Sequence, residues 1–358
     1  MPPPQTPVTV NLLAVPETAA SGLYGFIDVL SSVGVAWESA VAHTPVAPQF
    51  DVRIVAAGAH PFRCVSGALI TPDVSIDDAD AAQLVLIPAV QAGSTERWRT
   101  REPAVYEWLS GLDPSRSRLV SACTGALLLA EASVLNGHEA TTHWAYRDVF
   151  RRFYPEVRLR PERNICVSGR DACIVTSGGA SAWQALALYL IAQYCGPERA
   201  TQTAKFWLIS GVGNRQLPYS AMLIRQAHKD QTIEQCEFWI RTNLAKPSPV
   251  ESMIELSGLS ATTFSRRFRR ATGYTPIEYV QAARIEEAKR MLESGSHLVD
   301  EVSRQVGYGD TVSFRRLFKR HVGITPSEYR KRFGGARFDA IGDSAQGDIS
   351  NSHSSAEG

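Results

Sequence analysis

The sequence has no long apolar run, few cysteines and almost no net charge. None of its stretches reaches the roughly 18 continuous apolar residues of a membrane-spanning helix, so no span is expected. Its six cysteines show neither CxxC spacing nor a paired Cys/His arrangement, which argues against structural zinc. The N-terminal segment MPPPQTPVTV lacks the charged and apolar regions of a signal peptide. We therefore expect a reduced, cytoplasmic protein without disulfides, bound metal or cofactor.

Positive charge is concentrated in one part of the chain. The formal net charge of all 358 residues is +1, so the global charge does not point to a polyanionic partner. Residues 248–334, however, carry 15 Lys and Arg against 10 Asp and Glu. The hydrophobic fraction of 44% is typical of a globular protein, and the length fits two or three domains.

Short β-branched runs alternate with helical patterns in the N-terminal part. Continuous apolar runs of this kind are typical of strands buried on both faces of a parallel sheet. The expected strands are 8–15, 50–58, 83–90, 118–122 and 172–179, and the expected helices include 124–135 and 180–195. The stretch 155–169 is predicted to form a hairpin before the last strand. The pattern predicts an α/β domain over 8–200, with a parallel sheet flanked by helices in a flavodoxin-like, amidotransferase-like arrangement.

The strand pattern stops near residue 200, and helices separated by Gly, Pro and Ser follow. We expect an interdomain connection over 201–227 and an all-α domain over 228–334. Residues 335–358 are polar and small, and a disordered tail is expected there.

A repeat with a period of 50 residues is the most specific feature of the sequence. The recurring pairs are Phe264 and Phe314, Phe268 and Phe318, Gly273 and Gly323, Pro276 and Pro326, and Tyr279 and Tyr329. Each copy has a short helix, a turn with Gly258 or Gly307, and a strongly basic second helix. The two phenylalanines of each copy are expected on the buried face of that helix, with the arginines opposite. This pattern predicts a double helix-turn-helix, whose second helices enter the major groove of DNA.

Residues 228–334 resemble the AraC-type DNA-binding domain, above all in VSRQVGYGDTVSFRRLFKRHVGITPSEYRKRF. The resemblance implies groove-facing residues in both copies, with Arg269 and Lys319 nearer to phosphates. The implied DNA-binding residues are Thr262, Ser265, Arg266, Arg269, Thr311, Val312, Arg315, Arg316 and Lys319. Ile254 and Ser303 stand where the family usually has alanine, so the two helices of each motif can approach each other differently.

Cys123 follows the strand 118–122 and precedes a helix that opens with Thr124-Gly125. A thiol over the backbone N–H groups of a helix N-terminus favours the thiolate, and the turn has the form of a nucleophile elbow. Glu17 is expected at the same carboxyl end of the sheet, and His143 could come close in space. A cysteine at the end of a core strand is as often a packing residue, and the spacing alone does not decide between the two.

Residues 8–195 resemble the ThiJ/PfpI, class I glutamine-amidotransferase-like superfamily. The stretch SACTGALLLAEASVLNGHEATTHWAYRDVF is similar to that of isocyanide hydratase and of the GlxA branch of regulators. The resemblance implies a pocket at the elbow formed by Cys123, Thr124, His143, Glu17 and Gly179.

Two departures from that superfamily argue against catalysis, and a third affects the shape of the pocket. Thr124 stands where the peptidases have a histidine. Gly22 aligns with the aspartate of the hydratases, and glycine cannot transfer a proton. Pro88-Ala89-Val90 replaces the usual Pro-Gly-Gly, so side chains there should narrow or reshape the pocket.

Over about residues 8–334, the chain thus resembles a GlxA-type AraC-family transcriptional regulator. The resemblance implies a catalytically inactive domain that senses a small nitrogen-containing metabolite and controls a DNA-binding domain. Expected partners are double-stranded DNA, the small-molecule effector and, for an activator, RNA polymerase; a homodimer is compatible, and no membrane partner is expected. Two alternatives stay open: a cysteine-dependent hydratase or hydrolase that uses Cys123 with His143 or Glu17, and a redox sensor through Cys123.

Overall fold

The computed structural model describes residues 6–42, 47–93, 97–179, 181–209, 228–294 and 297–333. The chain divides into two compact units, Met1–Gln216 and Leu217–Gly358. Most of the predicted connection 201–227 and all of the predicted tail 335–358 lie outside the described residues. No helix in the described ranges is long and apolar enough to cross a membrane.

The first unit is built around a sheet whose described strands run in the order β10-β11-β7-β6-β1-β2-β5. Neighbouring strands pair in parallel, except for the antiparallel pair β10 and β11. The strands are β1 (Val8–Leu13), β2 (Phe50–Ala56), β5 (Val74–Ser75), β6 (Leu84–Ile87), β7 (Arg118–Ala122), β10 (Ile165–Ser168) and β11 (Ile174–Ser177). All five predicted strands are present, as β1, β2, β6, β7 and β11.

Helices cover both faces of this sheet, which is why β6 is buried along its whole length. On one face, Leu23 and Phe26 of α1 (Ala20–Ser31) and Leu190 of α5 (Ala182–Cys195) pack in one hydrophobic core. The other core contains apolar residues of α2 (Ala104–Gly111), α3 (Ala126–Glu131) and α4 (Arg147–Phe153). Helix α6 (Pro197–Phe206) packs against α5. The remaining short elements are β3 (Phe62–Arg63), β4 (Leu69–Ile70), β8 (Glu139–Ala140), β9 (Arg158–Leu159), and the helical turns η1 (Glu38–Ala42), η2 (Cys123–Gly125), η3 (Trp144–Tyr146) and η4 (Arg170–Ala172).

The predicted hairpin over 155–169 is wrong. Strand β9 pairs in parallel with β8, whereas β10 pairs antiparallel with β11. The reason is burial: Cys166 of β10 is buried, so this strand extends the central sheet, while Arg158 of β9 is exposed. The hairpin is therefore formed by β10 and β11, and Gly169 (φ 78°) lies in the turn between them.

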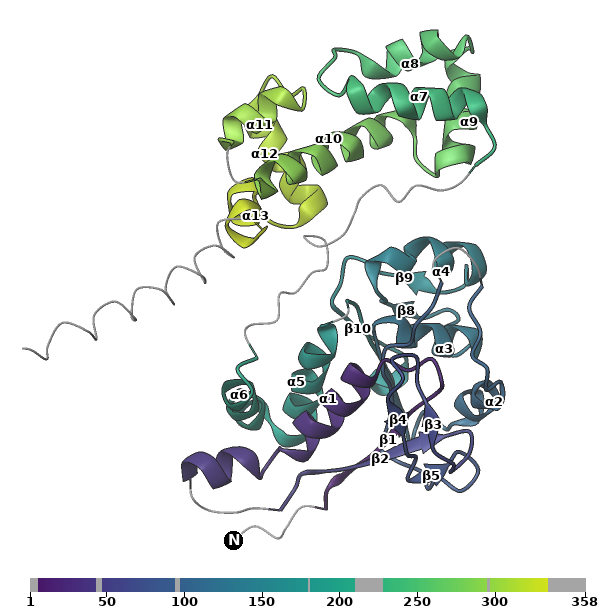
Figure 1. Cartoon of the computed structure of the whole chain (residues 1–358), viewed down its shortest axis with the longest axis vertical. Coiled ribbons are helices and arrows are strands. Elements are labelled where there is room, and N and C mark those ends of the chain that lie inside the picture. Colours follow the sequence, from purple (N-terminus) through teal and green to yellow (C-terminus); the bar gives the residue numbers. More distant parts are fainter. Residues whose placement is uncertain are drawn as a thin grey trace, which may run out of the picture. The chain divides into compact units, whose positions relative to one another are not determined.

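The second unit contains only helices among its described regular elements, so the predicted order of an α/β domain followed by an all-α domain is confirmed. These helices are α7 (Gln231–Thr242), α8 (Pro249–Ser257), α9 (Ala261–Thr272), α10 (Pro276–Glu293), α11 (Val299–Gln305), α12 (Thr311–Val322) and α13 (Pro326–Phe333). Helices α8 and α9 form one helix-turn-helix, α11 and α12 form the other, and α10 joins them (Figure 1).

Each motif has its own hydrophobic core. Phe264 and Phe268 pack in the first, Phe314 and Phe318 in the second, and all four side chains are fully buried. The caps also repeat. Ser260 caps α9 and Asp310 caps α12 through side-chain oxygens that accept backbone N–H bonds. Thr275 and Thr325 form equivalent capping interactions with Glu278 and Glu328.

The two motifs differ in the length of the turn. One residue separates Gly258 from the cap Ser260, whereas two residues separate Gly307 from the cap Asp310. The departures from the alanine pattern also have different surroundings. Ile254 is half-buried, whereas Ser303 is fully buried and its hydroxyl has no hydrogen-bond partner among the described residues.

Candidate functional sites

Helices α9 and α12 each bury a phenylalanine stripe and expose the opposite side. The stripe repeats every four residues, so the intervening pairs of side chains point outward. Eight of the predicted DNA-binding residues are exposed, and the remaining one, Thr311, is half-buried. The exposed residues are Thr262, Ser265, Arg266, Arg269, Val312, Arg315, Arg316 and Lys319. Val312 stands out, because an apolar side chain is here 73% exposed.

The arginines at these positions differ in their partners. Within the described ranges, Arg266 and Arg316 make no hydrogen bond or ion pair. Arg315 instead donates an Nη2 hydrogen bond to Asp300 Oδ1 at 3.0 Å, between two exposed side chains. The guanidinium groups of Arg266 and Arg316 occupy equivalent positions in the two motifs and keep their hydrogen-bond donors for a partner, while the charge of Arg316 also contributes to the lowered pKa of Asp310.

Arg269 and Lys319 lie near the capping carboxylates of the following helices. Hydrogen bonds from Thr275 hold the pKa of Glu278 below its usual range, and the charge of Arg269 adds to this effect. The pKa of Glu328 is lowered in the same way by hydrogen bonds from Thr325 and, more weakly, by the charge of Lys319. On α9, the side chains of Ser265, Arg266 and Arg269 line an open groove of about 510 Å³, together with Arg270 and Thr275.

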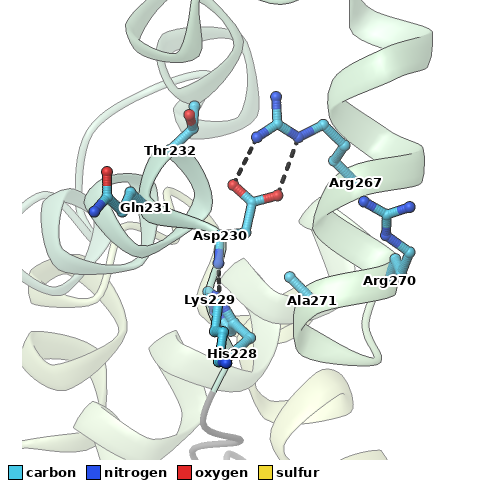
Figure 2. Close-up of a pocket in the computed structure, with 8 residues that line it drawn as sticks. All are labelled: His228, Lys229, Asp230, Gln231, Thr232, Arg267, Arg270 and Ala271. Carbon is cyan, nitrogen blue, oxygen red and sulfur yellow. Dashed lines mark hydrogen bonds and ion pairs between the residues drawn. The ribbon is translucent and has the colours of Figure 1, made fainter.

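A second open cleft, of about 550 Å³, lies between residues 228–232 and α9 (Figure 2). In it, Asp230 accepts two hydrogen bonds from Arg267, one from Nε at 3.0 Å and one from Nη2 at 2.8 Å. The bond from Arg267 is the main reason why the pKa of Asp230 is lowered. Asp230 also caps α7 by accepting from the N–H of Ile233.

This Asp230–Arg267 contact was not predicted. The repeat nevertheless indicated that Arg267 has a separate role, because it is matched by the apolar Leu317 in the second copy. A position that is arginine in one copy and leucine in the other is not a shared DNA-reading position. The structure accordingly gives Arg267 a partner in its own unit.

In the first unit, Cys123 occupies the sharp turn between β7 and α3. Its φ of 56° is left-handed, which is unusual for a residue with a side chain. Gly125, two residues on, lies so close to the neighbouring loop that a Cβ there would be 2.5 Å from the carbonyl oxygen of Pro88. The hydroxyl of Thr124 bonds both the N–H and the carbonyl of Val90. The predicted elbow geometry is thus present, and it is held against the loop that carries Pro88 to Val90.

Burial at this elbow opposes the thiolate that a helix N-terminus favours. Cys123 is only 5% exposed, and burial raises its pKa more than the bonds from Thr124 lower it. The helix behind it is also short: α3 ends at Glu131, and Ser133 already has a positive φ. Desolvation therefore outweighs the helix N-terminus, and the thiol is protonated at neutral pH.

The other predicted residues of this site are held by different neighbours. The side chain of His143 accepts from the N–H of Ala145, and burial lowers its pKa, so its imidazole is neutral. The carboxylate of Glu17 accepts from the hydroxyl of Thr100 at 2.8 Å and from the N–H of Arg101. Neither residue makes a hydrogen bond to the Cys123 thiol within the described part of the chain.

Two residues that the sequence did not single out interact with Cys123. The hydroxyl of Thr142 donates to the carbonyl of Cys123 at 2.9 Å. The pKa of Tyr146 is raised, mainly by burial and also by the charge that Cys123 would carry. The predicted Gly179 has a φ of 83° and lies just before α5.

Gly22, in α1, is buried and faces the same loop as the elbow. A Cβ at this position would be 3.8 Å from the Cβ of Pro88. The position aligned with the hydratase aspartate therefore lies beside the Pro88 loop, but in this chain it carries no side chain.

Comparisons with known proteins match both units. A model of the DJ-1/PfpI family matches residues 28–193, and a model of a helix-turn-helix domain matches residues 254–332. The chain is 26% identical over 298 residues to the HTH-type transcriptional regulator CdhR of Pseudomonas aeruginosa, covering 82% of this chain and 86% of the relative. It is 25% identical over 269 residues to GbdR of the same species, covering 74% and 70%. Over 222 residues it is 24% identical to GlxA of Rhizobium meliloti, covering 61% and 66%.

Proposed function

We propose that the chain binds specific DNA sites through both of its helix-turn-helix motifs. The basis is its place among GlxA-type AraC-family transcriptional regulators, in which a DJ-1/PfpI domain is joined to an AraC-type helix-turn-helix domain. A small nitrogen-containing metabolite, bound near Cys123, controls this binding. The proposed domains are residues 8–200 for sensing and 228–334 for DNA binding.

One observation carries the DNA-binding proposal: Arg266 and Arg316 are exposed, unpaired among the described residues, and equivalent in two motifs of one chain. An arginine fork can bond two acceptors of guanine in the major groove. Around it, Thr262 and Ser265 offer hydroxyls, and Val312 offers an apolar contact that suits a thymine methyl group. Two such helices suit two half-elements about ten base pairs apart.

The elbow supports binding rather than turnover. A protonated thiol, a neutral His143 held by Ala145, and glycine at position 22 leave Cys123 without an evident proton-transfer partner. A ligand at this site would act through linkage, by favouring the form of the chain that binds DNA better or worse. In this proposal the chain acts in the cytoplasm, and it contacts RNA polymerase if it activates transcription. A homodimer is compatible with it.

A cysteine-dependent hydratase or hydrolase is the second candidate, because the left-handed backbone at Cys123 is a strain that functional residues often carry. Isocyanides, amides and glyoxals test it directly. Turnover by the wild-type protein that is lost in Cys123→Ala would establish the enzyme. Absence of turnover together with specific DNA binding would support the regulator.

The decisive experiment is selection of bound DNA from a random library by the full-length protein, at low and near-physiological salt. We expect a motif with two half-elements about one helical turn apart. The control is the double variant Arg266→Ala/Arg316→Ala, which should no longer enrich that motif. Binding that is only salt-sensitive and independent of sequence, with and without candidate amines and amino-acid derivatives, would contradict the proposal.

A further inference from the structure

Besides its connection through α10, the second helix-turn-helix motif contacts the segment between α7 and α8, which precedes the first motif. Arg284, near the middle of α10, donates from Nε to the carbonyl of Leu244 at 2.8 Å and from Nη2 to the carbonyl of Lys246 at 3.3 Å. Both carbonyls belong to the segment between α7 and α8. The guanidinium carbon of Arg284 also lies 5.2 Å from the ring centre of Tyr308, in the turn of the second motif.

The backbone of the second turn lies directly against this segment. Gly307 has a φ of 88°, and a Cβ on it would be 2.8 Å from the carbonyl oxygen of Leu244 and from the Cα of Ala245. The equivalent Gly258 also has a positive φ, but nothing lies within 4 Å of its Cβ position. Among the described residues, the glycine of the second turn is therefore crowded by another part of the unit, whereas the glycine of the first turn is not.

Tyr308 ties this contact to the core of the second motif. Its ring lies 5.6 Å from that of Phe314, and its hydroxyl is buried without a hydrogen-bond partner among the described residues. The extra residue in the second turn thus gives the chain room to place an aromatic ring between Arg284 and Phe314.

We propose that Arg284, Gly307 and Tyr308 form an interlock that fixes the second motif relative to the first and so sets the spacing between the two DNA half-elements. The inference rests on the proposed DNA binding. A single connecting helix holds two bodies at a distance but lets them twist, whereas a second contact removes that freedom. On B-DNA, a change of one base pair in spacing moves a half-element by about 3.4 Å and rotates it by about 34°. Arg284 is a positioning residue in this proposal.

The test measures binding of the full-length protein to the selected site, to spacer variants longer or shorter by one or two base pairs, and to each half-element alone. The wild type should show a sharp optimum in spacer length. Arg284→Ala should bind the optimal site on the order of tenfold more weakly and lose much of its spacing preference, because the second half-element no longer benefits from a preset position. Its affinity for each single half-element should stay unchanged.

Two matched pairs of variants separate the interlock from loss of folding. Arg290→Ala, on the same helix, removes a guanidinium whose partner within the described part of the chain is Glu287, three residues away, and should keep the wild-type spacer profile. Gly307→Ala should reproduce the loss of spacing preference, and Gly258→Ala should not, although both place alanine at a positive φ.

A wild-type spacer profile in both Arg284→Ala and Gly307→Ala would overturn the interlock. So would an equal loss of affinity for bipartite sites and single half-elements, since that is the signature of damaged motifs. A wild-type protein that selects no sequence would overturn the proposed function itself, and with it the role of the interlock in reading DNA.

Discussion

The carboxylate of Asp230 is held by the guanidinium of Arg267 through two hydrogen bonds, at 3.0 and 2.8 Å (Figure 2). Asp230 is the cap of α7, and Arg267 lies on the helix that carries Arg266. These contacts therefore connect the N-terminus of α7 to α9, the helix that we propose contacts the bases of DNA.

We predict that Asp230→Ala lowers the free energy of unfolding of the second unit by about 1 kcal/mol through loss of the cap, and further through loss of the ion pair. Asp230→Asn keeps a capping oxygen and removes only the charge, so its loss should be smaller. Calorimetry of the full-length variants measures both values. Equal stability of all three proteins would show that the contact contributes nothing.

The same pair gives a pH dependence. Because the pKa of Asp230 is lowered in the folded protein, chiefly by Arg267, its contribution is present above the unfolded value of about 3.9 and is lost as the pH falls below it. Asp230→Asn should therefore lose less stability than the wild type below about pH 4. Urea unfolding at several acidic pH values measures the difference. Parallel pH profiles of the two proteins would contradict the lowered pKa.

Arginines on α9 and α12 should fall into two groups. Arg266→Ala and Arg316→Ala should each weaken binding to the selected site by about 1–3 kcal/mol and relax the preference at one base position. Arg269→Ala should weaken binding to all sequences alike and reduce the salt slope by about one. Titrations at several salt concentrations with matched and mismatched sites separate the two effects. Unchanged site preference in Arg266→Ala together with an unchanged salt slope in Arg269→Ala would show that α9 faces the DNA differently.

Cys123 should react slowly. Its buried, protonated thiol should be alkylated at neutral pH at least about tenfold more slowly than a free thiol, with a rate that rises only above the ordinary thiol pKa near 8.5. The half-exposed Cys195 serves as an internal control and should be labelled first. Peptide mass spectrometry of timed samples gives both rates. Rapid labelling or peroxide oxidation of Cys123 at pH 7 would instead favour the redox sensor.

Gly125 should tolerate no side chain. Gly125→Ala places a Cβ against the carbonyl oxygens of Ile87 and Pro88, at 2.6 and 2.5 Å, so we expect a loss of about 1–3 kcal/mol in the first unit. The backbone of Gly125 has an ordinary helical φ, so the effect isolates crowding. Gly111→Ala is the control, because nothing lies within 4 Å of its Cβ position. Equal thermal stability of the two variants would mean that the elbow and the Pro88 loop move apart easily.

The features that could be read from the sequence are those that local pattern controls. Apolar runs predicted β1 and β6, because both faces of these strands are covered. The phenylalanine spacing predicted α9 and α12, because one side of each helix is buried. Pairing between distant segments is different. The partner of β9 could not be found from residues 155–169 alone, because its hydrogen bonds go to His138 and Ala140.

The candidate sites show the same division. The elbow at Cys123 could be predicted, because a strand, a glycine and a helix follow one another in the sequence. The protonation of its thiol could not, because it depends on burial by residues far away in the sequence. Arg284 was not singled out either, since its partners Leu244 and Tyr308 are 40 and 24 residues away and one of them is a backbone carbonyl. Because every residue has a backbone carbonyl, a backbone acceptor cannot be identified from residue types.

The unequal turns of the two motifs give the DNA-binding unit a direction. Its halves resemble each other, yet only the second has the longer turn, the crowded Gly307 and the Val312 surface. A chain bound through both motifs would therefore have two non-equivalent ends on the duplex. Its target would be a site that reads differently in its two orientations, and reversing that site would exchange the places of the two motifs on the duplex.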